Sequence, residues 1–443
     1  MHIAYGDGET RTISANDLPD NDNAAGERFG FSMDTVDWND DGCTDLFIGA
    51  PFENWSNNTL PDAGVVVFIP GSPAGLDVSL AKNWSSAIHG ADSSKANTRF
   101  GWDLAAGLDA AGEPYLVVGM PGRDTTTATG ETLVDIGSVI YIRATAAKMF
   151  NQNSASFSDS FEPGDMFGYS VAASESGFAV GVPGESAEFA TGTIRKTGTV
   201  FLVGHNDANT TPTQIAAWGQ GSPDVNDHYE DSDMYGYSLD MVDYISTGGG
   251  ASRMMIAVGA PGEAIGSRTS AGLSMVMWSP GTGITEYRYL RQDADGSAAD
   301  DAERGDAFGA AVAMVNRTPG QITSVNTLLL TVGVPGEDAD GRYEVGQAQL
   351  FSMTEDAAQE NNLVREKLPT TSFTPADGAT IGRVLHATKA QLFVTAKGAT
   401  GPAVYGIPWD NLVAGGTAAV KAYTPATFGL TNSDVVSFGA SLA

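Results

Sequence analysis

The dipeptide Phe-Gly, or a close variant of it, recurs along the whole chain at intervals of 57 to 73 residues. Each of the first five copies is followed by an apolar run that ends in Gly-x-Pro, such as FIGAP at 47–51 and AVGVP at 179–183. A fixed period means that one small structural unit is copied and stacked, and this outweighs the expectation of two or three domains from length alone. The copies begin at Phe29, Phe100, Phe167, Tyr235, Phe308, Ile381 and Phe438.

The segments within each copy have the composition of β-strands. They are short and rich in Val, Ile, Phe, Tyr and Thr, and they are bounded by Gly, Pro, Asn and Asp. No long helix is predicted. In the second copy the four strands are expected at 100–108, 114–120, 137–142 and 147–153. Four antiparallel strands repeated around an axis form a β-propeller, in which the aromatic ring packs between blades and the glycine lets backbones approach closely.

The two ends of the chain contain parts of a further copy. Residues 2–6 and 10–15 align with third and fourth strands, and 438–443 aligns with a first strand. We therefore predict an all-β, seven-bladed β-propeller of four-stranded antiparallel blades, with the seventh blade split between the N- and C-termini. Neither end supplies its second strand, so either this blade is incomplete in a longer chain or the ring has six blades with loose ends. The single predicted domain spans 1–443, with blades at 29–99, 100–166, 167–234, 235–307, 308–380 and 381–437 and the split blade at 1–28 plus 438–443.

The repeated units resemble the FG-GAP repeats of the integrin α-subunit β-propeller and its bacterial relatives, and the resemblance covers essentially the whole chain. It implies the fold more strongly than a function, because the family includes adhesion receptors and many secreted bacterial proteins. The sixth copy departs from the pattern. It has Ile381-Gly382 in place of Phe-Gly and FVTAKG at 393–398 in place of the Gly-x-Pro run.

An acidic loop, DWNDDGCTD at 37–45, lies between the first two predicted strands of the first copy. Oxygen-bearing side chains at alternate positions, followed by a glycine for the turn, can surround a hard cation such as Ca²⁺. The loop resembles the calcium loops of integrin-type propellers, which occupy the same hairpin, so one structural calcium ion is expected. The alternative is a solvated acidic turn. The predicted ligands are Asp37, Asn39, Asp41 and Asp45, with Cys43 contributing its backbone carbonyl.

The matching hairpin of the second copy offers only Asp109 as a ligand. Further acidic runs precede three Phe-Gly copies, at 17–23, 224–233 and 293–306. Asp293, Asp295 and Asp300 or Asp301 could bind calcium, but their spacing matches a calcium loop less well than 37–45 does. A charge run usually forms a solvated face, and we predict that here.

The formal net charge of −31 argues against binding to nucleic acid or to an anionic membrane surface. No apolar run is long enough for membrane insertion, and no signal peptide is present at the start. A single cysteine excludes an intrachain disulfide. With the family resemblance, we expect an extracellular or cell-surface protein whose leader lies outside these residues; an intracellular protein is the alternative.

Catalytic motifs are not found in the sequence. The five histidines lie in different copies, and no GxSxG, HExxH or phosphate-binding loop is present. Acidic neighbours should raise the pKa of Cys43 and make it a poor nucleophile. We predict a noncatalytic adhesion, recognition or scaffolding module. The alternatives are a propeller-based secreted hydrolase or lyase with converging carboxylates or a His, and the accessory propeller of a larger enzyme.

A protein or glycan partner is expected at the long loops between the second and third strands, because loops on a rigid scaffold usually carry function. In integrin-like propellers this face also binds ligands. Aromatic and arginine side chains contribute most to interfaces. The predicted partner-binding residues are Trp55, Arg123, Arg195, Arg268, Arg342 and Tyr343.

Overall fold

The structure is a computed structural model of the 443-residue chain. It describes all residues except 7, 19–25, 56–58, 207–211, 226, 266–267, 270–271, 280–282, 293–301, 340, 355–361, 370–372 and 432–437. The chain divides into two compact units. Unit 1 comprises Met1–Gly219 with Ala443, and unit 2 comprises Gln220–Leu442.

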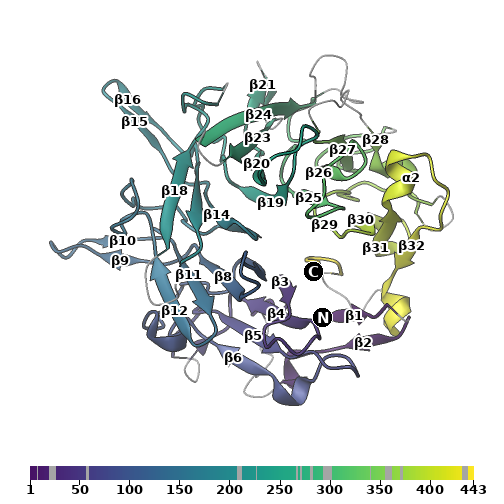
Figure 1. Ribbon diagram of the computed structural model, residues 1–443, viewed down its shortest axis with the longest axis horizontal. Coiled ribbons are helices and arrows are strands. Elements are labelled where there is room, and N and C mark those ends of the chain that lie inside the picture. Colours follow the sequence, from purple (N-terminus) through teal and green to yellow (C-terminus); the bar gives the residue numbers. More distant parts are fainter. Residues whose placement is uncertain are drawn as a thin grey trace. The chain divides into compact units, whose positions relative to one another are not determined.

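Unit 1 contains three four-stranded antiparallel sheets and a separate N-terminal hairpin (Figure 1). The hairpin consists of β1 (His2–Ala4) and β2 (Thr10–Thr12). The strands of each sheet follow one another in chain order. In the last two sheets of unit 1, the connection between the second and third strands contains a small two-stranded ribbon. The sheets are β3 (Ser32–Val36), β4 (Asp45–Ala50), β5 (Val65–Ile69) and β6 (Lys82–Trp84); β7 (Leu104–Leu108), β8 (Pro114–Met120), β11 (Ser138–Arg143) and β12 (Ala146–Phe150); and β13 (Ser170–Ser174), β14 (Gly177–Val182), β17 (Thr199–Gly204) and β18 (Thr213–Trp218). The ribbons are β9 (Thr125–Thr126) with β10 (Thr132–Leu133) and β15 (Ala187–Phe189) with β16 (Gly192–Ile194); short 3₁₀ turns are η1 (Ala15–Asp17), η2 (Val78–Leu80) and η3 (Ile88–Gly90).

Unit 2 repeats the same plan with three more four-stranded sheets. Its single described α-helix, α2, has five residues, in agreement with the prediction that no long helix occurs. The sheets are β19 (Ser238–Tyr244), β20 (Arg253–Ala260), β23 (Gly272–Ser279) and β24 (Gly283–Arg291); β25 (Val312–Asn316), β26 (Leu328–Val334), β27 (Gln347–Ser352) and β28 (Asn362–Leu363); and β29 (Leu385–Ala387), β30 (Gln391–Gly398), β31 (Gly401–Pro408) and β32 (Lys421–Tyr423). The remaining elements are the ribbon β21 (Ala264–Ile265) with β22 (Arg268–Thr269), α2 (Trp409–Val413), η4 (Val364–Lys367) and η5 (Pro425–Phe428).

The hydrophobic cores lie between consecutive sheets, because alternate residues of a strand point to opposite faces. Leu116 packs with Phe47 of the preceding sheet, whereas Val117 packs with Phe178 of the following sheet. We call the contact between the first two sheets of unit 1 the first joint and the contact between its second and third sheets the second joint. Small antiparallel meanders packed face to face in this way make the protein an all-β fold of the β-propeller type.

Phe-Gly lies in a turn before the first strand of each copy and not within the strand, which corrects the predicted strand start at residue 100. Each of the first six glycines has a φ of 83° to 86° and is followed by a strand that begins two or three residues later. The residue two positions before each of these glycines also has a positive φ, a costly conformation for a side chain that the sequence did not reveal. These residues are Arg28, Arg99, Met166, Met234, Ala307 and Thr380.

The glycine of Gly-x-Pro lies where the next sheet comes closest. A Cβ atom on Gly119 would lie 2.1 Å from the carbonyl oxygen of Gly168, the Phe-Gly glycine of the following sheet. Gly49 and Gly333 meet the next Phe-Gly glycine in the same way, at 2.2 and 2.0 Å. The predicted close backbone approach therefore occurs, and it explains why the two motifs recur together.

The split seventh blade is not confirmed. The hairpin β1–β2 forms as predicted, but the described residues give it no further strand, and residues 438–441 form a turn and a bend. The prediction of a strand at 438–443 is wrong because the Phe-Gly turn uses most of these residues. Gly439 nevertheless packs against Thr395 of β30, which occupies the position of the Gly-x-Pro glycine in the sixth copy. The described residues thus form six four-stranded sheets.

Candidate functional site

The predicted calcium loop at 37–45 folds around its own backbone amides. The two carboxylate oxygens of Asp37 accept hydrogen bonds from the amides of Asp41 and Gly42, at 3.1 and 2.9 Å. Asn39 also accepts from the Asp41 amide, and Asp41 accepts from the Cys43 amide. The φ of Gly42 is 83°, so the turn needs its glycine. These hydrogen bonds hold the side-chain oxygens of Asp37, Asn39 and Asp41 against the backbone amides of the same loop.

Asp45 anchors this loop to the sheet. It is fully buried, and its carboxylate accepts from the amides of Trp38 and Gly71 at 2.9 and 2.6 Å. Burial and the nearby acidic side chains, Asp41 first, raise the pKa of the Cys43 thiol, as expected from the sequence. Of the predicted ligands, Asp37, Asn39 and Asp41 therefore share hydrogen bonds within the loop, whereas Asp45 supports the turn. In the second copy Asp109 forms an ion pair of 2.5 Å with Arg143.

The predicted partner-binding residues have unequal environments. Tyr343 is 73% exposed, and Arg195 and Arg342 are exposed. Trp55 is half-buried against the core of the first sheet. Arg123 is only 8% exposed and takes part in an internal ion pair described below. The structure does not describe the side chain of Arg268. Asp293, Asp295, Asp300 and Asp301 also lie outside the described residues.

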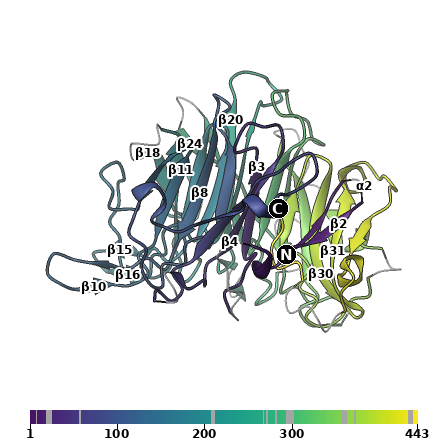
Figure 2. The same cartoon turned by 90° about the horizontal axis from the view of Figure 1, so that it is seen from below.

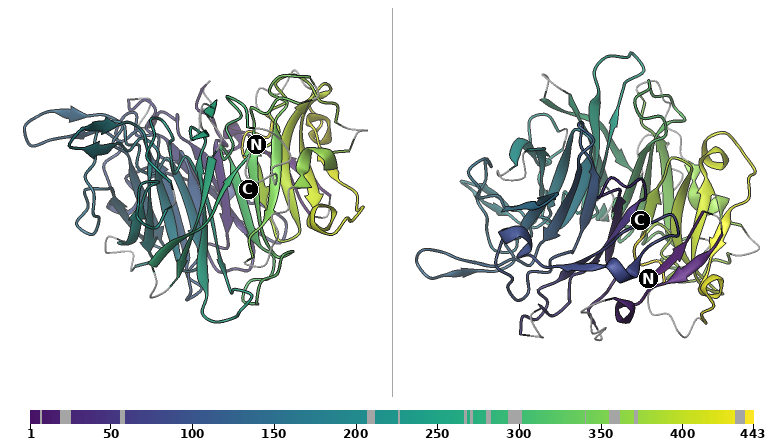
Figure 3. Two further views of the ribbon diagram at one scale, coloured as in Figure 1. Left: turned by 90° about the horizontal axis from the view of Figure 1, so that it is seen from above. Right: turned by 60° about the horizontal axis from the view of Figure 1, so that its bottom comes forward.

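Three of the predicted partner loops contain two-stranded ribbons that the sequence did not predict. In unit 1, ribbons β9–β10 and β15–β16 extend beyond the four-stranded sheets (Figures 2 and 3). Large apolar side chains are exposed on or beside them: Phe189 at 50% and Val134 at 51%. The hairpin and ribbon ends of an antiparallel sheet are opposite, so the ribbons lie at the end away from the 37–45 loop.

The sequence did not predict a group of carboxylates at the base of ribbon β15–β16. Glu162, Asp165 and Glu185 each have an oxygen within 4.8 Å of the others, so among the described residues these three side chains could together hold a metal ion. Asp165 is 1% exposed and Glu185 is 8% exposed. Gln152, fully buried at the end of the preceding sheet, donates from Nε2 to Glu185 Oε2 at 2.5 Å.

These carboxyl groups disfavour each other's ionisation. Burial, followed by the charges of Asp165, Asp159 and Glu162, raises the pKa of Glu185 to about 9. Burial also raises the pKa of Asp165 to about 7, against a hydrogen bond from the Glu162 amide that lowers it. Among the described residues, no lysine or arginine forms an ion pair with this group. A recognisable signal existed, since the sequence ExxDxFG or its Tyr variant precedes three of the repeats.

Unit 2 contains two groups of the same composition. In one, Gln220 donates to Glu263 beside Asp233, and burial raises the pKa of Glu263 to about 8 and that of Asp233 to about 7. In the other, Gln292 donates to Glu337 at 2.6 Å. The acidic runs at 224–233 and 293–306 were predicted to form solvated faces. This prediction is wrong for Asp233 and Asp306, which are 1% exposed. Each lies two residues before the aromatic residue of its repeat, and the turn at that point places the aspartate in the core.

The first joint has an arginine where the second joint has Glu185. Arg123 Nη2 donates to Asp92 Oδ1 at 3.1 Å, and Nε lies 3.0 Å from Oδ2. Counted back from Phe-Gly, Lys95 and Thr98 occupy the positions of Glu162 and Asp165. The same corner of the repeat thus contains a paired cation in the first joint and unpaired carboxylates in the second.

The first strands of neighbouring sheets are joined by aspartates. Asp34 accepts from the Ala106 amide at 2.6 Å, and Asp103 accepts from the Val171 amide at 2.8 Å. Burial raises the pKa of Asp34 to about 6 and that of Asp103 to about 7. Two carboxylates near each other could suggest acid–base chemistry, but both already accept backbone amides across a joint, so their geometry is that of structural groups.

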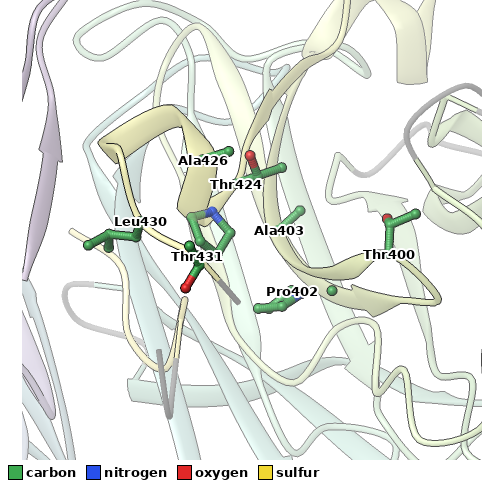
Figure 4. Close-up of a pocket in the computed structure, with 9 residues that line it drawn as sticks. Thr400, Pro402, Ala403, Thr424, Ala426, Leu430 and Thr431 are labelled. Atoms are coloured by element: carbon green, nitrogen blue, oxygen red, sulfur yellow. The ribbon is translucent and has the colours of Figure 1, made fainter. Parts of the chain in front are cut away.

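A pocket of about 350 Å³ lies in unit 2 beside β31 and η5 (Figure 4). Its walls contain no acidic, basic or histidine side chain, so this pocket lacks the groups needed for acid–base catalysis. The lining residues are Thr400, Gly401, Pro402, Ala403, Thr424, Pro425, Ala426, Leu430 and Thr431.

No family model and no curated protein sequence matches this chain. Among solved structures, a protein from Bacteroides uniformis named as a candidate 6-phosphogluconolactonase is 8% identical, with a TM-score of 0.44, over 89% of this chain and 83% of that one. The Dos1 propeller is 10% identical, with a TM-score of 0.37, over 82% of this chain and 64% of that one. Likenesses at this level carry no argument about function.

No helix among the described residues is long and apolar enough to cross a membrane.

Proposed function

We propose that this protein is a noncatalytic, calcium-binding recognition module, related to the integrin-type FG-GAP propellers, that binds a protein or glycan outside the cell through its ribbon loops. The observation that carries the proposal is the pairing of rigid four-stranded sheets with ribbons that expose large side chains. Phe189 is half exposed at the end of β15, within a loop carried by packed sheets, and such loops are where binding residues concentrate.

Two features support the resemblance to FG-GAP repeats. The first is the close contact of the Gly-x-Pro glycine with the next Phe-Gly glycine, which gives both halves of the motif a physical reason. The second is the 37–45 loop, in which the side-chain oxygens of Asp37, Asn39 and Asp41 accept hydrogen bonds from amides of the same loop. One Ca²⁺ ion at this loop would hold the β3–β4 hairpin and would have no chemical role.

Partner binding is tested with the whole chain on an array of immobilised glycans and purified extracellular-matrix proteins. We expect a specific signal that is lost in Phe189→Ser and Arg195→Ala and is kept in Leu80→Ser, which changes an exposed apolar residue away from the ribbons. Signals equal in all four proteins, or no signal on any ligand class of the array, would argue against a recognition surface at the ribbons.

The calcium loop is tested by a local measurement. Trp38 lies within the loop, so Tb³⁺ bound there should luminesce on tryptophan excitation. We expect this luminescence in the wild type and its loss in Trp38→Phe and in the double variant Asp37→Asn/Asp41→Asn, with Ca²⁺ competing for the site. Unchanged luminescence in the double variant would contradict a metal site in the loop.

A further inference from the structure

We propose that Glu162, Asp165 and Glu185, together with the amide oxygen of Gln152, form a second kind of calcium-type site, buried in the second joint at the base of ribbon β15–β16. The site is separate from the 37–45 loop, which lies at the opposite end of the sheets, and the proposal stands whether or not that loop binds metal.

The spacing of the three carboxylates suits one ion. Oxygen ligands lie 2.3–2.6 Å from Ca²⁺, so ligands on opposite sides are about 5 Å apart. The ligand atoms of Glu162, Asp165 and Glu185 all lie within 4.8 Å of one another. Glu162 is only half-buried and gives the site an opening toward solvent.

A buried and unpartnered amide oxygen provides an independent observation. Gln152 is fully buried, its Nε2 contacts Glu185, and its Oε1 has no hydrogen-bond partner. Both atoms are bonded to the same carbon, so the amide oxygen lies within a few ångströms of the Glu185 carboxylate. A buried acceptor without a donor costs roughly 1–3 kcal/mol. An ion held between the carboxylates and this oxygen would remove that cost.

The first joint indicates what charge this corner of the repeat requires. There the position of Glu185 is occupied by Arg123, which brings a positive charge to Asp92 at 3.0 Å. In the second joint the acidic groups form no ion pair with a lysine or arginine of the described residues. A buried charge needs a partner, and a divalent cation is the partner that three carboxylates and an amide oxygen bind well.

The site is coupled to the ribbon through the backbone of Glu185. Its carbonyl oxygen accepts from the Gly198 amide at 3.1 Å and from the Thr197 hydroxyl at 3.2 Å, which closes the loop that carries β15 and β16. An ion at Glu185 would therefore fix the base of the ribbon. The groups around Glu263 and Glu337 in unit 2 repeat the same pairing with a buried glutamine, and their glutamine oxygens also have no partner.

The test measures the number of Ca²⁺ ions bound by the full chain after removal of metal with a chelator. Isothermal titration with CaCl₂ is done in the Asp37→Asn/Asp41→Asn background, so that the 37–45 loop does not contribute. We expect calcium binding to remain in this background, to fall by one ion in Glu185→Gln, and to weaken roughly tenfold in Gln152→Leu. Glu113→Gln, which changes an exposed glutamate of the β7–β8 hairpin, should bind as the background does.

Three outcomes would overturn the proposal. The background protein could bind no calcium, or Glu185→Gln could bind as many ions as the background. In the third, the melting temperature of Glu185→Gln exceeds that of the background protein by the same amount with and without calcium. That result would mean that the carboxyl group binds protons and no calcium. Circular dichroism verifies that each variant is folded. Because the loop is tested by tryptophan-sensitised luminescence, failure of this site and failure of the loop give different results.

Discussion

The first and second joints of unit 1 share their backbone contacts and differ in the charges at one end. In both joints, a Gly-x-Pro glycine lies against the Phe-Gly glycine of the next sheet. In both, an aspartate at the first strand of one sheet also accepts a hydrogen bond from a backbone amide in the first strand of the next sheet. At the ribbon end, the first joint contains Arg123 paired with Asp92, and the second contains the Glu162, Asp165 and Glu185 group. Close glycine contacts and apolar faces therefore specify the joint, while its polar corner accepts either sign of charge if a partner is available.

Reversing the charge of the first joint should have the largest effect. Arg123→Glu leaves Asp92 without its cation and adds a buried negative charge, so we expect a loss of about 4 kcal/mol in unfolding free energy. Chemical denaturation measures it. Arg195→Glu makes the same change on an exposed side chain and should cost much less. Adding Asp92→Asn to Arg123→Glu should recover part of the loss; no recovery would mean that packing and not charge decides.

The shared backbone contact should come next. Gly119→Ala places a Cβ atom 2.1 Å from a backbone oxygen, which cannot move without shifting the next sheet, and we expect a loss of about 3 kcal/mol. Gly49→Ala should behave alike in the first joint. The control is Gly6→Ala, since nothing lies within 4 Å of that position. Equal thermal midpoints for Gly119→Ala and Gly6→Ala would break the argument that glycine contacts specify the joints.

Removing one charge from the second joint should have a smaller effect of opposite sign. In chelator, at a pH above the Glu185 pKa of about 9, Glu185→Gln relieves repulsion with Asp165 and Glu162, and we expect a gain of about 1 kcal/mol. With calcium present, the same variant should melt below the wild type because a ligand is lost. Differential scanning calorimetry in both buffers measures the two signs. A lower midpoint than the wild type in chelator would contradict the view that this group lacks a partner.

The smallest difference concerns pH. Burial raises the folded-state pKa of Asp34 to about 6 and that of Asp103 to about 7. The folded state therefore binds more protons than the unfolded state, and the stability from each group is lost as pH rises from about 4 through those values. We expect about 1 kcal/mol for each, since both residues keep partial contact with water, which screens their charges.

Thermal midpoints of Asp34→Asn and Asp103→Asn between pH 4 and pH 8 measure this difference. Each variant should show a flatter profile than the wild type, and the flattening should extend to higher pH for Asp103. Profiles parallel to that of the wild type would show that the two aspartates keep ordinary pKa values.

Sequence reasoning located the repeated sheets well, because period and strand composition are local properties. The strands of the second copy were predicted at 114–120 and 137–142 and are found at Pro114–Met120 and Ser138–Arg143. It misplaced Phe-Gly, since the positive φ values of Arg99 and Gly101 depend on the sheet against which the turn packs. The same cause made 438–443 look like a strand.

The two candidate sites also differ in whether the sequence could reveal them. The loop at 37–45 could be recognised in the sequence because its residues are adjacent in the chain, and the hydrogen bonds from its amides to its own side chains follow from that local spacing. The group around Glu185 was not visible, because Gln152, Asp165 and Glu185 come from three segments that meet only when one sheet packs on the next.

From its repeats alone, this chain had to form small antiparallel sheets joined at glycine contacts, because apolar alternation and missing Cβ atoms act over a few residues. Only the tertiary structure decided which charged groups were buried and whether they had partners. Arg123 and Glu185 follow the same Gly-x-Pro pattern, and what distinguishes them is the segment that packing brings beside each one. The energy of a buried charge depends on that neighbour, and no local pattern contains it.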